Sequence, residues 1–475
     1  EVLQESLLDQ VLYTNDALIS SCRTLSPLGK SDHVSVLVEL DASLNNIKIN
    51  EKIEKPSWGK IAFGELLTHS KDNIDWSFSC NDNTQDMWDE LHGKLMDVAA
   101  IVPTTSVYRN NRPVKLPWDS SKLKRMRRNK DEAWMTFDTN PTNANLCFAN
   151  CKQGIFEKEE IKAKLRYEKR ITADLKTNCK SFYSYLRNKR KVKSAVPSLD
   201  KEDGSRTTSA AESAEVLASA FSSVFVREPS GPLPDISCGG SNRDVITDII
   251  ITNEGVRKEL LKLNIFKSMG PDEIHPKVLK ALADDSGFVS ALTLLFSKCN
   301  ETGVLPEVWK TASVVGLFKK GAKSDPLNYR PVSLTCILCK VYEKFIRSHI
   351  LTFLESSICK EQHGFMEGKS CLSNLLETFD TIFDLISDGA PVDIFYFDFS
   401  KAFDTVPHYR LLSKLENLGI NGKVLDVVRD FLSNRTMRVI VEGKESEVKC
   451  VWSGVPQGSV LGTLLFILFI NDLPD

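Results

Sequence analysis

The feature that most constrains this chain is an apolar run that ends on an acidic side chain. The β-branched and aromatic side chains of residues 392–397 predict a buried strand, and Asp398 follows them directly. Packing of such a strand would hold Asp398 at a rigid edge, with Asp404 a little further on. Hard cations such as Mg²⁺ take a few well-held oxygen ligands and leave room for substrate phosphates. The run therefore indicates either a metal-dependent phosphoryl-transfer site or a strand that ends in an ordinary turn aspartate.

A second informative segment spans residues 454–462 and opens an apolar run from Leu464 to Ile470. Glycines on both sides of Pro456 and Gln457 make a loop whose backbone can approach a nucleotide closely. The Gln457 amide can hydrogen-bond sugar or base edges. Together the two segments resemble motifs A and B of a reverse transcriptase palm, in the form typical of non-LTR (LINE-type, jockey-like) retrotransposons.

The resemblance implies a fold, an activity and a set of partners. We expect an α+β chain in which residues 246–475 form reverse-transcriptase fingers and a partial palm. The implied activity is RNA-directed DNA synthesis during target-primed retrotransposition, with Mg²⁺ (or Mn²⁺) as the cofactor. The implied partners are an RNA template, a DNA target that supplies the primer, and deoxynucleoside triphosphates.

The same resemblance assigns roles to residues of the two motifs. Asp398 is the expected catalytic metal ligand, and Phe399 lends a backbone carbonyl to the nucleotide site. Phe403 is the expected gate that crowds the 2′-hydroxyl of ribonucleotides. Gln457 and Gly458 are expected to contact the nucleotide, whereas Asp404 is expected to brace the turn.

Basic residues upstream match the fingers of such polymerases. Lys319 or Lys320, and Arg330, occupy positions expected to hold the triphosphate, a task that suits arginine because its planar fork binds phosphate oxygens bidentately. The alternative is that these are surface charges on a hairpin. Gly364 and Lys369 lie in a loop whose family counterpart follows the template, ahead of a helix expected over 372–386.

The first forty residues resemble the end of another domain. An Asp–His pair at the mouth of a strand suits general-base chemistry, and residues 31–38 have this pattern. By resemblance to the endonuclease/exonuclease/phosphatase domain, His33 is the base, Asp32 belongs to the site and Asp9 orients the histidine. Residues 1–40 are too few to bury the core of that fold, so we expect no nuclease activity.

The net charge of −2 conceals a strong asymmetry. Residues 122–193 carry 20 Lys/Arg against 8 Asp/Glu, a local balance of +12. Aromatic residues lie near the basic clusters, a combination that suits phosphate contact and base stacking, although a solvated helix face or a nuclear-import signal remains an alternative. The expected nucleic-acid contacts are Lys124, Arg125, Arg127, Arg128, Arg187, Lys189 and Arg190.

Composition indicates how the rest of the chain is divided into regions. We assign residues 41–115 and 201–245 to linker regions, the latter containing a helical patch at 210–226, and residues 116–200 to a basic helical region. The spacing of Cys336 and Cys339 is that of half a zinc site, but their apolar spacers favour a core role. The 12 cysteines show no secreted framework, so we expect an intracellular setting, in nucleus and cytoplasm as a ribonucleoprotein.

Two further expectations concern activity. The family usually has Pro-Gly-Pro-Asp-Gly in the turn at 268–273, and Met269 and Glu273 depart from that pattern. The sequence shows no aromatic-x-Asp-Asp turn after motif B, so we expect residues 1–475 alone to be inactive in processive synthesis. A competing hypothesis is a non-catalytic nucleic-acid-binding remnant of a decayed element. A maturase or telomerase-like polymerase is disfavoured by the nuclease-like segment upstream.

Overall fold

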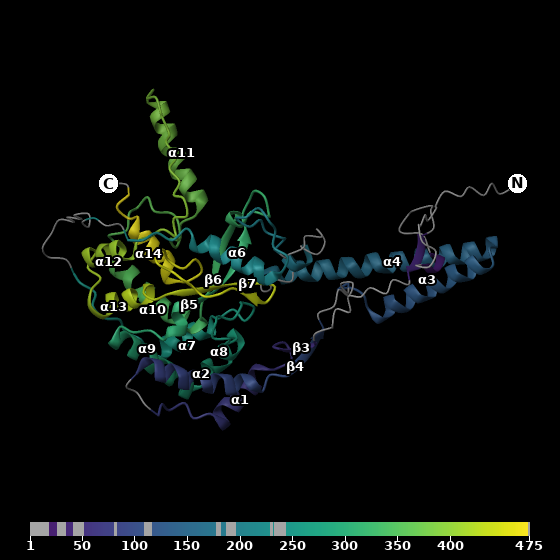
Figure 1. Cartoon of the computed structure of the whole chain (residues 1–475), viewed down its shortest axis with the longest axis horizontal. Helices are drawn as coiled ribbons and strands as arrows, with labels where there is room; N and C mark the ends of the chain where they lie inside the picture. The colour runs from purple at the N-terminus through teal and green to yellow at the C-terminus, as the bar shows by residue number, and fades with distance from the viewer. Residues whose placement is uncertain are drawn as a thin grey trace. The chain divides into compact units, whose positions relative to one another are not determined.

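The computed structural model describes residues 19–25, 35–40, 52–79, 83–108, 116–176, 182–186, 196–228, 231 and 244–473. The chain forms two compact units, each made of two separate stretches of sequence. The first contains residues 1–55 and 105–193, and the second contains residues 56–104 and 194–475. Helices and sheets both occur in the described residues, so the α+β class is confirmed (Figure 1).

The first unit is dominated by a helical hairpin made of α3 (Ser121–Thr139) and α4 (Asn143–Ala173). Each helix begins at a hydroxyl side chain that accepts a backbone N–H of the first turn, Ser120 for α3 and Thr142 for α4. Phe156 is buried in the hairpin under the Arg127 guanidinium, 5.6 Å from the ring centroid. The basic helices expected between residues 116 and 193 are therefore present.

Four short strands occur in the N-terminal part of the chain. They are β1 (Ile19–Leu25), β2 (Ser35–Leu40), β3 (Lys52–Pro56) and β4 (Thr104–Tyr108). β1 pairs with β2 in antiparallel fashion, and β3 pairs with β4. The strand that the pattern at 31–38 predicts is thus confirmed from Ser35.

The second unit is built around a core of packed helices. The helices that contribute buried side chains are α1 (Phe63–Asn73), α2 (Thr84–Ala100), α7 (Asn253–Leu261), α8 (Pro276–Ala281), α9 (Ser286–Thr302), α10 (Ile337–Phe353), α12 (His408–Asn417), α13 (Gly422–Leu432) and α14 (Leu461–Phe469). Trp309 and Tyr342 are among the largest fully buried side chains. Cys336 and Cys339 are both fully buried, which agrees with the core role expected from their apolar spacers.

Two helices of this core lie within residues 41–115, which were expected to form a linker region. Leu66 of α1 and Leu91 of α2 are fully buried in the same cluster as the downstream helices. A polar contact also joins α1 to α9, since the Ser70 hydroxyl donates to Asp285, which caps α9, over 2.5 Å. Residues 56–104 therefore belong to the second unit and help to build its core.

A mixed sheet lies beside the helical core and supports the site described below. Its strands are β5 (Thr311–Phe318), β6 (Tyr329–Leu334), β7 (Thr436–Val441), β8 (Lys444–Glu445) and β9 (Lys449–Cys450). β5 pairs antiparallel with β6 and parallel with β7, and both β8 and β9 return against β7. The strand that returns against β7 is thus divided in two, β8 and β9.

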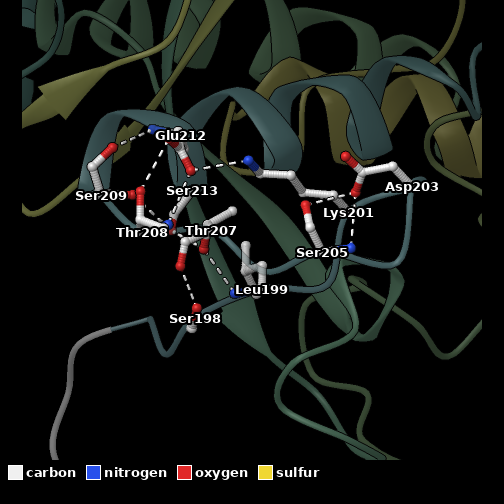
Figure 2. A network of polar contacts seen from close by, with 10 residues as sticks. All are labelled: Ser198, Leu199, Lys201, Asp203, Ser205, Thr207, Thr208, Ser209, Glu212 and Ser213. Atoms are coloured by element: carbon white, nitrogen blue, oxygen red, sulfur yellow. Dashed lines mark hydrogen bonds and ion pairs between the residues drawn. The ribbon is translucent and has the colours of Figure 1, made fainter.

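One face of this sheet is covered by α6 (Ala210–Ser222), where Leu217 and Phe221 pack on Ala312 and Val314 of β5. A polar network fixes the start of α6 (Figure 2). In this network the Ser209 hydroxyl accepts the Glu212 N–H and so caps α6, and the Thr207 hydroxyl accepts the Leu199 N–H. The network turns the chain sharply before α6 and so holds this helix against the sheet.

The turn at residues 268–273 keeps its tight backbone despite the two departures from the family pattern. A Cβ at Gly270 would lie 2.7 Å from the Cα of Cys336, so only glycine fits there without a shift. Glu273 adopts a positive φ of 56°, a conformation that favours glycine and costs other residues about 1–2 kcal/mol. The turn therefore forms with Glu273 under backbone strain.

The strand expected at residues 392–397 is wrong. These residues have no regular secondary structure, and the Phe397 side chain is 93% exposed. The helix expected just before them is present as α11 (Cys371–Ser387), but none of its residues is buried, and Figure 1 shows it projecting away from the other helices of the unit. No strand of the described residues pairs with 392–397, and β-propensity without a ladder partner does not make a strand.

Candidate functional site

The structure joins the end of the first motif to the start of the second. The Gly454 N–H donates to the Val406 carbonyl over 2.8 Å, and the Val455 N–H donates to the Phe403 carbonyl over 2.7 Å. Gly454 has a φ of 85°, and a Cβ there would lie 2.6 Å from the Phe403 oxygen. Glycine is therefore required at 454 because the chain passes directly against residues 403–404.

Gln457 is held through its backbone and its side chain. Its carbonyl accepts the Ser333 N–H of β6 over 2.8 Å. Its side-chain Nε2 donates to Asp404 over 3.3 Å. A Cβ at Gly458, whose φ is 122°, would lie 2.5 Å from the Ser333 carbonyl. The glycines of this loop thus permit close approach to the protein's own backbone, while approach to a nucleotide stays a prediction.

The helix that follows this loop is capped from a distance. α14 has no side-chain cap of its own, but the Glu343 carboxylate of α10 accepts the N–H groups of Val460 over 2.6 Å and Leu461 over 2.8 Å. A negative charge at a helix N-terminus is favourable because of the unpaired N–H groups there. Burial nevertheless raises the pKa of Glu343, which is 1% exposed.

A second buried charge lies in this part of the fold. Arg435 is 2% exposed, and its Nη1 donates to the Phe431 carbonyl over 2.8 Å. Burial lowers its pKa, and the nearby Cys339 and Glu343 act in the opposite direction. Arg435 and Gln457 line the same small cavity.

Phe403, the expected gate, is packed between two aromatic rings. It stacks on Phe466 of α14 with ring centroids 4.5 Å apart, and it meets Phe365 edge-on at 5.8 Å. Aromatic pairs of this kind add to the packing energy beyond the buried area. The ring of Phe403 is therefore fixed by contacts from both the loop at 365 and the helix after the second motif.

His408 also ties the two motifs together. Its Nε2 lies 2.8 Å from the Gly454 carbonyl, which fits the tautomer that carries its proton on Nε2. Burial lowers the pKa of His408 from its ordinary value of 6.5. The imidazole is thus held as a neutral hydrogen-bond donor.

The expected phosphate-binding residues lie on the β5–β6 hairpin. Lys319, Lys320 and Arg330 are all exposed, and Arg330 pairs in register with Leu317. Val315 pairs with Val332 on the same face, which is the face opposite to that covered by α6. The hairpin thus presents Arg330 on an open surface, and its contact with a triphosphate stays a prediction.

Asp398, the expected metal ligand, lies on the irregular segment and is exposed. The adjacent Phe399 is 54% exposed. Within the part of the chain that the structure describes, no group of three or more His, Cys, Asp or Glu side chains could hold a metal ion. As arranged here, the described residues therefore do not fit a complete Mg²⁺ or Mn²⁺ site, and the ligand role of Asp398 stays a prediction.

The loop expected along the template path contains both fixed and open residues. Gly364 is exposed, and the Lys369 ammonium donates to the Lys360 carbonyl. His363 is buried, with its ring nitrogens 3.0 Å from Ser373 and 2.9 Å from Glu377 of α11. These contacts give His363 a structural role, because both ring nitrogens are occupied by side chains of α11.

The basic residues of the first unit lie mainly at its surface. Lys124, Arg125 and Arg128 are exposed on α3, whereas Arg127 is half-buried and paired with Asp119 at 3.1 Å. Three of the four are therefore available for phosphate contact. The other predicted residues lie outside the described residues; they are Arg187, Lys189, Arg190, Asp9, Asp32 and His33.

Sequence reasoning missed three residues of this site, namely Glu343, Arg435 and His408. Glu343 lies on the apolar face of α10 at helical spacing from Cys339, and a charged residue on such a face is a signal that could have been followed. Its partners are separated from it by 117 and 118 positions, so the pairing itself needed the structure.

Part of the chain matches a known protein family. Residues 319–475 match the family described as reverse transcriptase (RNA-dependent DNA polymerase). The matched region contains Phe403, Asp404 and Gln457, the residues that the structure brings together. In the described residues, no helix is long and apolar enough to cross a membrane.

Curated relatives come from mobile elements. The chain is 32% identical over 227 residues to the RNA-directed DNA polymerase from mobile element jockey of Drosophila melanogaster, covering 47% of this chain and 24% of that protein. It is 30% identical over 224 residues to the probable RNA-directed DNA polymerase from transposon BS of the same fly, covering 46% and 24%. It is 23% identical over 318 residues to the transposon TX1 uncharacterized 149 kDa protein of Xenopus laevis, covering 65% and 24%.

These comparisons confirm the resemblance to reverse transcriptases of non-LTR, LINE-type mobile elements. The chain spans about a quarter of the length of the curated relatives that it matches.

Proposed function

We propose that the chain is part of an RNA-directed DNA polymerase of a non-LTR retrotransposon. One observation carries this proposal: within the region that matches reverse transcriptases, residues 403–408 and 453–461 are hydrogen-bonded into a single site. In the reaction, a target DNA 3′-hydroxyl attacks the α-phosphate of a deoxynucleotide, a new P–O bond forms, and pyrophosphate leaves.

Each nucleotide-binding role follows from the chemistry of a side chain. Gln457 hydrogen-bonds the sugar or base, and Phe403, stacked on Phe466, blocks a 2′-hydroxyl by steric exclusion. Arg330 and the lysines at 319 and 320 neutralise the triphosphate from the open face of the β5–β6 hairpin. Phe399 borders the same site, and Gly458 allows the backbone of the loop to come close.

The family uses divalent metal ions, which polarise the reacting phosphate and stabilise the attacking and leaving oxygens. We propose Asp398 as the residue of this chain that would bind such an ion, Mg²⁺ or Mn²⁺. The described residues do not complete a metal site around it.

We propose that the basic helices bind the RNA template or the DNA target. Lys124, Arg125 and Arg128 of α3 are exposed, whereas Lys122 pairs with Glu159. Gly364 and Lys369 would lie along the template. Each phosphate neutralised releases counterions, so binding should weaken steeply between about 50 and 200 mM salt. A ribonucleoprotein of this kind would occur in nucleus and cytoplasm.

A second candidate function is nucleic-acid binding without catalysis. It is favoured by the exposed, irregular setting of Asp398, which differs from the rigid strand edge that the sequence predicts. The two candidates share the basic helices and differ in whether the nucleotide site works.

The test uses a dead-end complex, in which the polymerase can bind a nucleotide but cannot add it to the primer. An RNA template is annealed to a DNA primer that ends in a dideoxynucleotide, so nothing can be added, and dissociation of the whole chain is followed in Mg²⁺ with each deoxynucleotide in turn. The polymerase proposal predicts that only the nucleotide complementary to the template slows dissociation. Arg330→Ala should remove that effect, and Asp380→Asn, on exposed α11, should keep it. Binding that ignores the nucleotide would favour the non-catalytic alternative.

A further inference from the structure

Every exposed side chain in the middle of α4 is basic or aliphatic. Between residues 156 and 170 the exposed side chains are those of Lys158, Ile161, Lys162, Leu165, Arg166, Lys169 and Arg170. The first six follow the spacing i, i+3, i+4, i+7, i+8 and i+11, so they share one face of the helix. We call the surface made by these six side chains the outward face of α4.

The acidic residues of α4 lie away from this face. All four are half-buried; they are Glu157, Glu159, Glu160 and Glu168. The Glu159 carboxylate accepts the Lys122 ammonium of α3 over 3.0 Å, and Glu168 accepts the Tyr185 hydroxyl. Lys162 also approaches Glu159, at 3.5 Å, but it shares that carboxylate with Lys122. The charges of the helix are therefore segregated, with the cations on the outward face.

This segregation does not favour the helix by itself. Lys158, Lys162 and Arg166 follow one another at i, i+4, where like charges destabilise a helix and opposite charges stabilise it. Ile161 and Leu165 lie between these cations and are 58% and 50% exposed. A face that met only water would be more stable with acidic residues at some of these positions. The outward face therefore suits an anionic surface better than it suits solvent.

A phosphate backbone fits this face better than a lipid surface does. A helix that lies on a membrane needs an apolar face of its own, separate from its charged face. The apolar side of α4 is already in use, because Phe156 and Ile171 are buried within the first unit. On the outward face, cations and aliphatic side chains are interspersed, as phosphates and sugars are along a nucleic-acid strand.

The length and composition of the face favour a duplex over a single strand. From Lys158 to Lys169 the helix rises about 16 Å, a length in which one strand of a B-form duplex carries about five phosphates. Proteins hold unpaired bases by stacking them on aromatic side chains. The outward face has no aromatic residue among its six members. It can therefore contact a backbone, but it offers no platform for unpaired bases.

We propose that the outward face of α4 binds the phosphate backbone of a double-stranded nucleic acid without reading its bases, through Lys158, Lys162, Arg166 and Lys169. This inference rests on the proposed binding of nucleic acid by the basic helices. It adds a second surface to the cations of α3 and names the form of nucleic acid that this surface takes.

The test measures binding of the whole chain to a labelled DNA duplex of about 20 base pairs over a range of salt concentrations. Each phosphate contact contributes about 0.9 to the slope of log affinity against log salt. The test variant carries Lys158→Gln, Lys162→Gln, Arg166→Gln and Lys169→Gln, which remove four charges and keep a good helix former at each position. Its slope should be shallower by about 3 to 4, and its affinity at about 100 mM salt should fall at least about 10-fold.

Two further variants separate this contact from a general effect of charge. The matched control removes four exposed lysines of the second unit by Lys60→Gln, Lys71→Gln, Lys258→Gln and Lys262→Gln, and its slope should change by less than about 1. The charge-keeping variant carries Lys158→Arg, Lys162→Arg and Lys169→Arg and should keep the wild-type slope. Circular dichroism should show the same helix content in all of them.

Other probes identify the ligand. An RNA duplex and a second DNA duplex of scrambled sequence are compared with the first, and the two DNA duplexes should bind within about 2-fold of each other because phosphate contacts carry no sequence information. Loss of affinity with either the DNA or the RNA duplex supports the inference, and the larger loss identifies which nucleic acid the face takes. An equal or larger loss with a single strand of the same length would contradict it.

The remaining outcomes separate this inference from the proposed function. If the test variant kept duplex affinity but lost binding to vesicles of phosphatidylserine and phosphatidylcholine, the face would be a membrane surface and the inference would be wrong. If Lys124→Gln, Arg125→Gln and Arg128→Gln together weakened duplex binding and the α4 variant did not, the inference would fail and the proposed function would stand. If neither set weakened it, the nucleic-acid binding proposed for the basic helices would fail as well.

Discussion

Two segments of the second unit have equally strong sequence patterns and different structures. The loop at 453–461 is held by hydrogen bonds to residues 403–406, to Ser333 of β6 and to Glu343 of α10. The segment at 371–399, which contains α11 and the apolar run before Asp398, has exposed side chains along nearly its whole length. The loop at 453–461 is surrounded by partners, whereas the segment at 371–399 is held to the rest of the described chain at its start, where Ser373 and Glu377 contact His363.

The difference teaches that the partners, and not the local pattern, determine the fold of such segments. α11 has the apolar spacing of an amphipathic helix, and it forms as a helix because its hydrogen bonds are internal. A strand cannot form alone in this way, since its backbone hydrogen bonds go to a neighbouring strand. The run at 392–397 therefore stays irregular while α11 stays helical.

The largest contrast should come from adding a methyl group at a glycine of each segment. Gly454→Ala combines a positive φ with a Cβ 2.6 Å from the Phe403 carbonyl, so we expect a loss of about 2–5 kcal/mol in the free energy of unfolding. Gly389→Ala has a similar φ of 79° but nothing within 4 Å, so only the conformational strain of about 1–2 kcal/mol applies. The measurement is unfolding in denaturant, and equal losses of unfolding free energy in the two variants would contradict the comparison.

Removing the distant helix cap should have the next largest effect. Glu343→Gln takes away a buried charge that accepts two N–H groups of α14, and we expect a loss of about 1–3 kcal/mol. The matched variant is Asp384→Asn on exposed α11, which should stay within about 0.5 kcal/mol of the wild type. If Glu343→Gln left the free energy of unfolding unchanged, the cap would not be what holds the loop.

The pH dependence of stability should report the hydrogen bond from His408 to Gly454. Because burial lowers the pKa of His408 below 6.5, the unfolded state binds a proton more readily than the folded state in the window below that value. Stability therefore rises with pH through this window and falls as the pH is lowered from about 7 towards 5. His408→Gln should reduce the slope of unfolding free energy against pH between about 5 and 7. An unchanged slope would show that His408 is not the group responsible.

The smallest effect is expected at the exposed run. Phe397→Ser removes a side chain that is 93% exposed, so the free energy of unfolding should change by less than about 0.5 kcal/mol. Phe403→Ser, a little further along the chain, removes a ring stacked on Phe466 and should lose at least about 1 kcal/mol. A large loss in Phe397→Ser would show that this ring is packed in solution.

Local signals made much of the fold predictable. Thr252 caps α7 by accepting the Gly255 N–H, as its position before the helix indicates. The helix expected at 372–386 lies inside α11. The expected helix at 210–226 ends at Ser222, where no local stop signal is strong.

The features that escaped prediction depend on contacts between distant residues. The role of Glu343 needs α14 to be placed at the end of α10, and the core role of Leu66 and Leu91 needs the downstream helices. The site could be predicted as far as the two motifs and their residue types. The contact between Asp404 and Gln457 could not be predicted, because it depends on how the loop crosses the turn at 401–404.

The central claim, that partners fix 453–461 and leave 392–398 open, is tested most directly by amide hydrogen exchange on the whole chain. The account predicts slow exchange at Gly454, Val455, Val460 and Leu461, whose N–H groups are hydrogen-bonded to other segments, and rapid exchange across 392–398. Adding a primed RNA template with its complementary nucleotide tests whether a ligand orders the open segment. Strong protection of 392–398 in the free chain, or rapid exchange at 454–461, would contradict the account.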